Sequence, residues 1–162
     1  FWQPYLNGER APFYSPDARA GFFGISPHTT RAELQRAVFE GLAFAIVDAL
    51  QGYPQGGELY LTGGGAASAT WLQIIADCTG RTVVSSAFNE LSARGAAILA
   101  ARSVVSLAET PPLAQTRYQP RPQAHARYAA LYPVYRLLRE QMLPVWQARQ
   151  AALQPLSQDL QP

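Results

Sequence analysis

Residues 58–68 have the sequence Glu58-Leu59-Tyr60-Leu61-Thr62-Gly63-Gly64-Gly65-Ala66-Ala67-Ser68. The first four residues predict a short strand, because apolar and aromatic side chains predominate. Ser68 is a residue type that caps helices, and a helix is predicted from there to about Thr79, with Gly80 as its C-terminal stop. The segment therefore predicts a strand that enters a helix through a turn of three glycines.

Such a glycine turn has the physical properties of a nucleotide-binding site. Without Cβ atoms, its backbone N–H groups can come close to a ligand. The helix that follows adds a partial positive charge and free N–H groups, which favour an anion. Taken alone, the pattern fits equally well a tight strand-to-helix turn that holds no ligand.

Strands and helices also alternate outside this segment, which predicts an α/β fold with a mixed, largely parallel sheet flanked by helices. Thr30 and Glu33 have the spacing of a capping box at the start of an apolar helix. Gly41 lies within that helix, where glycine is destabilising, and therefore indicates close packing. The other predicted elements are strands at residues 1–6, 20–25 (buried) and 81–84, and an alanine-rich helix from Ser92.

Composition divides the chain into three regions. Residues 1–108 form the α/β domain, residues 109–125 predict an extended Pro-rich connection, and residues 126–162 predict a terminal helix with a frayed tail. Pro133 and Pro144 are expected to kink or divide that helix. The chain opens on Phe1 as if inside a strand, without Met, so we expect a fragment whose start is missing.

Composition also excludes several classes of function. The chain has no lysine, which excludes a Schiff-base lysine and a Walker-type phosphate loop. The net charge is only +2, and the loose cluster of Arg117, Arg121 and Arg127 is interpreted as a solvated face, so no nucleic-acid partner is expected. Cys78 is the single cysteine and is interpreted as a buried apolar residue. The apolar runs are too short to span a bilayer, so no membrane partner is expected.

Three motifs occur in a recognisable order. The first is Tyr5-Leu6-Asn7-Gly8-Glu9-Arg10-Ala11-Pro12, and the second runs from Ala20-x-Phe22-x-Gly24-Ile25 to Glu33-Leu34-x-x-Ala37-Val38-Phe39-Glu40. The third is Thr62-Gly63-Gly64-Gly65-Ala66-x-Ser68-x-x-Trp71-x-Gln73-x-x-Ala76-Asp77, followed by Gly95-Ala96-Ala97. Together they resemble the C-terminal domain of the FGGY carbohydrate kinases, over roughly residues 1–105.

This resemblance implies a ribonuclease-H-like fold, related to actin and hexokinase, in which two domains close around ATP–Mg²⁺ and a sugar. It implies that the nucleotide lies against the glycine turn and the start of the next helix. The glycerol kinases of the family carry Asn at the position of Ala69, so the alanine argues against that subgroup. The implied cofactor-binding residues are Gly63, Gly64, Gly65, Ala66, Ser68 and Ala69.

Other polar and aromatic residues are interpreted as structural. Glu40 and Asp77 are expected to be packed, hydrogen-bonded carboxylates, and Trp71 a core residue in preference to a base-stacking platform. Glu90 is a secondary candidate for an approach to the nucleotide. The remaining expectations are a local ion pair between Glu9 and Arg10 and surface positions for His28 and His125.

The resemblance places the catalytic Asp, the first phosphate motifs and most sugar contacts in an N-terminal domain outside this sequence. We therefore expect no catalytic residue and no metal ligand in this chain. The full-length protein is expected to be a cytoplasmic enzyme that transfers the γ-phosphoryl group of ATP to a sugar hydroxyl. D-Xylulose is favoured as the acceptor, and the alternative is a gluconokinase or another FGGY sugar kinase. A homodimer is left open. Two hypotheses of other classes are a non-catalytic actin-like module and a structural domain whose glycine turn is empty.

Overall fold

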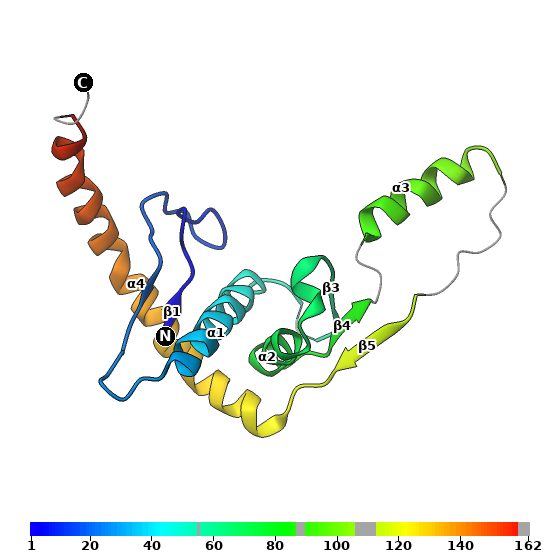
Figure 1. The fold of residues 1–162 in the computed structure, drawn as a ribbon, viewed down its shortest axis with the longest axis horizontal. Coiled ribbons are helices and arrows are strands. Elements are labelled where there is room, and N and C mark those ends of the chain that lie inside the picture. Colours follow the sequence, from blue (N-terminus) through cyan, green and yellow to red (C-terminus); the bar gives the residue numbers. More distant parts are fainter. Residues whose placement is uncertain (55, 87–89, 106–112, 159–162) are drawn as a thin grey trace.

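A computed structural model describes residues 1–54, 56–86, 90–105 and 113–158 (Figure 1). Strands and helices alternate along the chain, as the sequence predicts. The elements in order are β1 (Trp2–Gln3), β2 (Gly21–Phe22), α1 (Arg31–Ala49), β3 (Leu59–Leu61), the 3₁₀ turn η1 (Gly64–Ala67), α2 (Ala69–Thr79), β4 (Val83–Ser86), α3 (Leu91–Arg102), β5 (Gln115–Tyr118) and α4 (Pro122–Gln158).

The described strands form two small sheets. β3 and β4 are parallel, with Tyr60 opposite Val84, and β5 pairs antiparallel with β4 on its other side. β1 and β2 form a separate antiparallel ribbon. The mixed sheet is confirmed, but the expectation of largely parallel pairing is wrong, because only one of these three pairings is parallel. The strand β5 lies within residues 109–125, where the sequence predicts only an extended connection.

Helix α1 begins at the predicted capping box. The hydroxyl of Thr30 accepts the Glu33 N–H at 3.3 Å, and the Glu33 carboxylate accepts the Thr30 N–H at 2.8 Å. Gly41 packs against β1 so closely that a Cβ atom would lie 2.1 Å from the carbonyl oxygen of Trp2. The predicted packing role of this glycine is confirmed.

The main core lies between α1, α2, β4 and α4. Phe44 of α1 is 2% exposed and contacts the rings of Tyr128 and Tyr135 on α4. Tyr135 is fully buried, and its hydroxyl lies 3.2 Å from that of Tyr5. The face of α1 that is buried therefore carries Gly41 and Phe44, whereas Leu42 is 39% exposed. The strand at 21–22 is also less buried than expected, with Phe22 40% exposed.

Helix α4 is one continuous element that starts at Pro122, four residues before the predicted position. Proline suits this first helical position because its missing N–H would have no partner there. Pro133 and Pro144 do not divide the helix, so of the expected kink or division only the kink stays a prediction. α3, in contrast, stands apart from the other elements in Figure 1, and none of its residues is buried. Within the described ranges, no helix is both long enough and apolar enough to cross a membrane.

Candidate nucleotide site

The glycine turn connects the end of β3 to the start of α2. Gly63 has φ 85° and ψ −174°, a backbone conformation that only glycine adopts easily. The next residues form η1, in which the Ala66 N–H donates to the Gly63 carbonyl at 3.0 Å. From β4, the Ser85 hydroxyl donates to the Ala66 carbonyl at 3.3 Å. The turn is therefore attached to β3 through the chain and to β4 through the hydrogen bond from Ser85.

One side of the turn is open. A Cβ atom built on Gly63 or Gly64 would meet no heavy atom within 4 Å, and Gly64 and Gly65 are exposed. At Gly65, a Cβ would reach ordinary contact with the indole of Trp71, 3.4 Å away. The two leading glycines thus expose backbone to solvent, and a flat ligand could lie directly against it.

Ser68 joins the turn to α2 as the helix N-cap. Its Oγ accepts the Trp71 N–H at 3.3 Å, as predicted for a capping serine. Trp71 then packs on Phe39 of α1, with ring centroids 5.6 Å apart, and contributes to the edge of the core. Ala69, the first residue of α2, is exposed. The structure thus brings all six predicted residues into one continuous turn, with Trp71 behind it.

The turn carries hydrogen-bond donors but no acid or base. It offers backbone N–H groups and the N-terminal end of α2, but residues 62–70 include no ionisable side chain. In the described part of the chain, no three His, Cys, Asp or Glu side chains are grouped as a metal would require. We therefore assign no proton transfer and no Mg²⁺ ligand to residues 62–70, and the expected absence of such residues stays a prediction.

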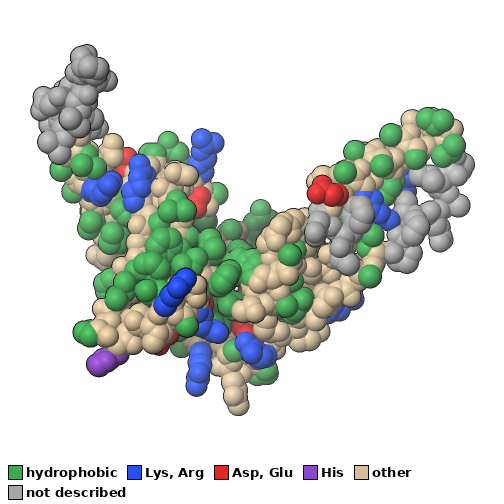
Figure 2. Space-filling model, viewed as in Figure 1, with side chains coloured by type: hydrophobic (Ala, Val, Ile, Leu, Met, Phe, Trp, Pro, Cys, Tyr) green, Lys and Arg blue, Asp and Glu red, His purple; other side chains and the backbone are tan. Residues whose placement is uncertain are grey.

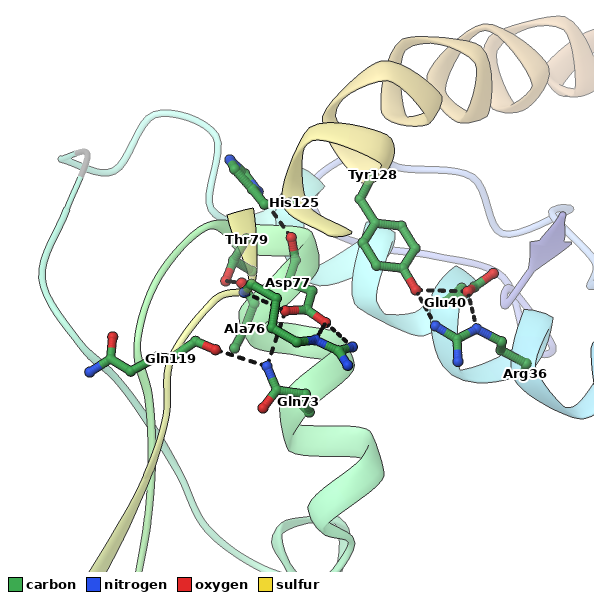
Figure 3. A network of polar contacts seen from close by, with 10 residues as sticks. Arg36, Glu40, Gln73, Ala76, Asp77, Thr79, Gln119, His125 and Tyr128 are labelled. Atoms are coloured by element: carbon green, nitrogen blue, oxygen red, sulfur yellow. Dashed lines mark hydrogen bonds and ion pairs between the residues drawn. The ribbon is translucent and has the colours of Figure 1, made fainter. Parts of the chain in front are cut away.

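Asp77 is a structural carboxylate, as predicted. It is fully buried in α2 and accepts hydrogen bonds from Gln73 at 3.0 Å and from Arg121, whose Nη2 is 2.5 Å away. Burial alone would raise the pKa of Asp77, but the hydrogen bonds from Arg121 and Gln73 outweigh it and hold the pKa below 3.8. The group is therefore a charged anchor between α2 and the start of α4 (Figure 3).

Glu40 is also part of a packed network, on α1. It accepts the Nε–H of Arg36 at 2.7 Å and the hydroxyl of Tyr128 at 2.8 Å. Burial and the hydrogen bond to Glu40 raise the pKa of Tyr128 to about 12. Figure 3 shows this network beside that of Asp77, on the side of α2 that faces α1 and α4.

Two expectations for other residues are wrong. Glu9 forms no ion pair with Arg10 among the described residues; instead its carboxylate accepts the backbone N–H groups of Arg10 and Ala11. His125 is half-buried in the first turn of α4, where Nδ1 lies 2.9 Å from the Asp77 carbonyl oxygen. Arg117 and Arg121 are about half exposed, as expected for a solvated face, and each also forms an ion pair, Arg117 with Glu58 and Arg121 with Asp77.

Other expectations hold or stay open. His28 is exposed in a turn, and Cys78 is buried, as predicted. Glu90 lies at the N-terminal cap of α3, and its approach to a nucleotide stays a prediction. No local pattern indicates the pairing of Asp77 with Arg121, because 44 residues separate them and only the fold brings them together.

The fold and the glycine turn can now be compared with known proteins. A family model described as the C-terminal domain of the FGGY family of carbohydrate kinases matches residues 1–104. The chain belongs to this family. The expected FGGY resemblance and the kinase-type α/β fold are thereby confirmed.

Two curated relatives and one solved structure represent the FGGY proteins that the chain resembles. Xylulose kinase of Escherichia coli K12 is 35% identical over 153 residues, which cover 88% of this chain and 31% of the relative. Erythritol kinase of Brucella abortus is 34% identical over 157 residues, covering 90% and 30%. Gluconate kinase of Lactobacillus acidophilus superposes with a TM-score of 0.80 at 25% identity, covering 91% and 32%. The chain thus spans about a third of the length of each of these proteins.

Proposed function

We propose that this chain is the nucleotide-holding part of an ATP-dependent sugar kinase. The observation that carries the proposal is the open glycine turn at the end of β3, in a chain of the FGGY carbohydrate kinase family. Gly63, Gly64, Gly65 and Ala66 would lie against the adenosine and the α-phosphate, with Ser68 and Ala69 beside them. The N-terminal end of α2 would favour the phosphate charge.

The proposed reaction of the full-length protein is transfer of the ATP γ-phosphoryl group to a sugar hydroxyl. Such a reaction needs a base for the attacking hydroxyl and Mg²⁺ to neutralise the phosphates. The glycine turn supplies neither, so its role is to position the nucleotide. The base, the metal ligands and most sugar contacts are proposed to lie in the remaining two thirds of the full-length protein, which would act in the cytoplasm.

D-Xylulose is the acceptor that we favour. It is supported by the identity to a xylulose kinase, at 35%, but an erythritol kinase is almost as similar and a gluconate kinase superposes well. Specificity belongs to the site and not to the fold, so these three acceptors are the ones to compare. Release of ADP by the full-length enzyme, measured with each acceptor, tests this choice. If kcat/KM were higher for gluconate or erythritol, that compound would replace xylulose as the proposed acceptor.

Gly64→Ala is the sharpest test of nucleotide binding by the turn. The new methyl group meets no protein atom within 4 Å, so the fold should keep its stability, whereas a nucleotide lying on the turn would be displaced. Titration of the labelled chain with a non-hydrolysable ATP analogue should perturb the amides of residues 63–69. We expect Gly64→Ala to weaken this binding by at least about tenfold.

Gly21→Ala is the matched control, because a Cβ there also meets nothing within 4 Å but lies in β2. Its nucleotide affinity should equal that of the unchanged chain. A folded chain that binds no nucleotide at millimolar concentration would exclude the assigned role of the turn and favour an empty structural turn.

A further inference from the structure

A polar cavity lies away from the glycine turn, between α1 and the start of α4. It has a volume of about 540 Å³, within the range of small-molecule sites. We propose that this cavity binds a phosphate group, as free phosphate or as a small phosphate ester. Its lining residues are Arg36, Glu40, Arg121, Gln123, Ala124, Arg127, Tyr128 and Leu131.

Three arginines from two parts of the chain converge on this cavity. Two of them are held in place by carboxylates: Arg36 by Glu40 through Nε at 2.7 Å, and Arg121 by the buried Asp77. Arg36 also donates its Nη2–H to the Tyr128 hydroxyl at 2.8 Å. About half of each side chain, 52% for Arg36 and 60% for Arg121, is still exposed. Both guanidinium groups are thus oriented in advance and can still bind a ligand.

Arg127 is the third arginine, and unlike Arg36 and Arg121 it is not paired with a carboxylate in the described part of the chain. It lies in the second turn of α4, is exposed, and has no hydrogen bond or ion pair among the described residues. A guanidinium group offers planar pairs of N–H donors whose spacing matches two phosphate oxygens. Arg127 therefore suits a phosphate ligand. Figure 2 shows basic side chains gathered on this part of the surface.

The start of α4 adds backbone donors to the same cavity. Gln123 and Ala124 belong to the first helical turn, whose N–H groups have no acceptor within the helix, and both residues line the cavity. The positive end of the helix dipole strengthens the preference for an anion. This contribution supports the arginines and does not replace them.

The charge balance is compatible with an anionic ligand. Three arginines and Glu40 line the cavity, and Asp77 lies behind Arg121 with no exposed surface. These five groups therefore carry a net charge of +1, and both carboxylates are already paired with guanidinium groups, although the side chain of Glu40 is still 27% exposed. A phosphate dianion would meet the exposed positive side of the two ion pairs.

This site is separate from the nucleotide site proposed above. The glycine turn precedes α2, whereas Asp77 and Arg121 meet near its C-terminal end. The eleven residues of α2 correspond to a length of about 16 Å. The proposal consequently does not depend on nucleotide binding, and the two can fail independently.

The test is a titration of the ¹⁵N-labelled chain with inorganic phosphate, glucose 6-phosphate and acetate at constant ionic strength. Both phosphates should shift the Gln123 and Ala124 amides saturably, and acetate should not. Tighter binding of glucose 6-phosphate would identify a phosphate ester as the ligand, and equal affinities would identify free phosphate. Saturable shifts with acetate of equal affinity would overturn the assignment to phosphate.

Arg127→Gln and Arg149→Gln form a matched pair for the same titration. Each removes one exposed arginine charge from α4, but only Arg127 lines the cavity. Arg127→Gln should weaken phosphate binding by about tenfold or more, whereas Arg149→Gln should change it less than twofold. Equal losses in the two variants, or shifts confined to residues 63–69, would refute the site.

Discussion

Arg121 binds Asp77 with three donors: its Nε and Nη2 reach Oδ2 at 3.0 and 2.5 Å, and its own backbone N–H reaches Oδ1 at 2.8 Å. Asp77 also accepts the side-chain amide of Gln73, so both carboxylate oxygens are fully used. The pair fixes the first turn of α4 on the end of α2. It thereby links the helix that follows the glycine turn to the helix that completes the core.

Asp77→Asn should destabilise the chain by about 2 kcal/mol, the usual loss for a hydrogen bond to a charged group. Asparagine keeps the shape, but its NH₂ group would face the guanidinium in place of an acceptor. We do not expect the larger loss that follows when a buried charge is left unpaired, because Arg121 is 60% exposed and its guanidinium group stays hydrated. Urea denaturation measures the change. The control is Glu140→Gln, which removes an exposed pair with Arg136 and a longer one with Arg139 at 3.6 Å. Because Glu140 is 46% exposed, the change should cost less than about 1 kcal/mol.

The same carboxylate should make stability depend on pH under acidic conditions. The folded-state pKa of Asp77 is lowered, so its stabilising contribution is complete above the unfolded-state value near 3.8 and is lost as the pH falls through the folded-state value. The free energy of unfolding should therefore decrease below about pH 4, and less steeply in Asp77→Asn. Urea titrations at several acidic pH values measure both slopes; identical slopes would show that another carboxylate dominates.

Local sequence signals predicted the elements next to the glycine turn. The Thr30–Glu33 capping box, the Ser68 cap and the Gly80 stop all depend on residues within a few positions of one another, and all three are present. The places of residues 63–69 in the turn and at the start of α2 follow for the same reason, since these residues are contiguous. Their role in nucleotide binding comes from the FGGY resemblance and stays a prediction.

Long-range pairing could not be predicted in this way. The antiparallel pairing of β5 with β4 is set by contacts between segments that are about thirty residues apart, such as Ser85 with Thr116. Leu34, Val38, Leu42 and Ile46 recur at fourfold spacing on α1, a pattern that predicts burial. Leu42 is nevertheless 39% exposed, because β1 and α4 cover the neighbouring face, where Gly41 permits contact with Trp2. Likewise, nothing near His125 in the sequence indicates that its ring lies over Gly80.

Cys78 should be unreactive in the folded chain. It is 6% exposed, and burial, with added repulsion from Glu40 and Asp77, raises the pKa of its thiol well above the ordinary value. Since the thiolate is the reactive form, a disulfide reagent at pH 8 should modify the native chain far more slowly than the urea-unfolded chain. Following thiol release by absorbance measures both rates. Rapid modification of the native chain would show that α2 opens readily.

Two glycine-to-alanine changes in helices should have opposite effects. In Gly41→Ala the new Cβ would lie 2.1 Å from the Trp2 carbonyl oxygen, a backbone atom that cannot move without displacing β1. We expect a loss of at least about 2 kcal/mol, at the upper end of overpacking effects.

Gly95→Ala is the matched change within α3, where a Cβ meets nothing within 4 Å. Alanine should stabilise that helix by about 0.5–1 kcal/mol, because glycine loses more backbone entropy on folding. Thermal unfolding followed by circular dichroism should thus show a lower midpoint for Gly41→Ala and an unchanged or higher one for Gly95→Ala. Equal stability of Gly41→Ala and the unchanged chain would mean that β1 does not pack against α1, and the contact between Trp2 and this helix would have to be abandoned.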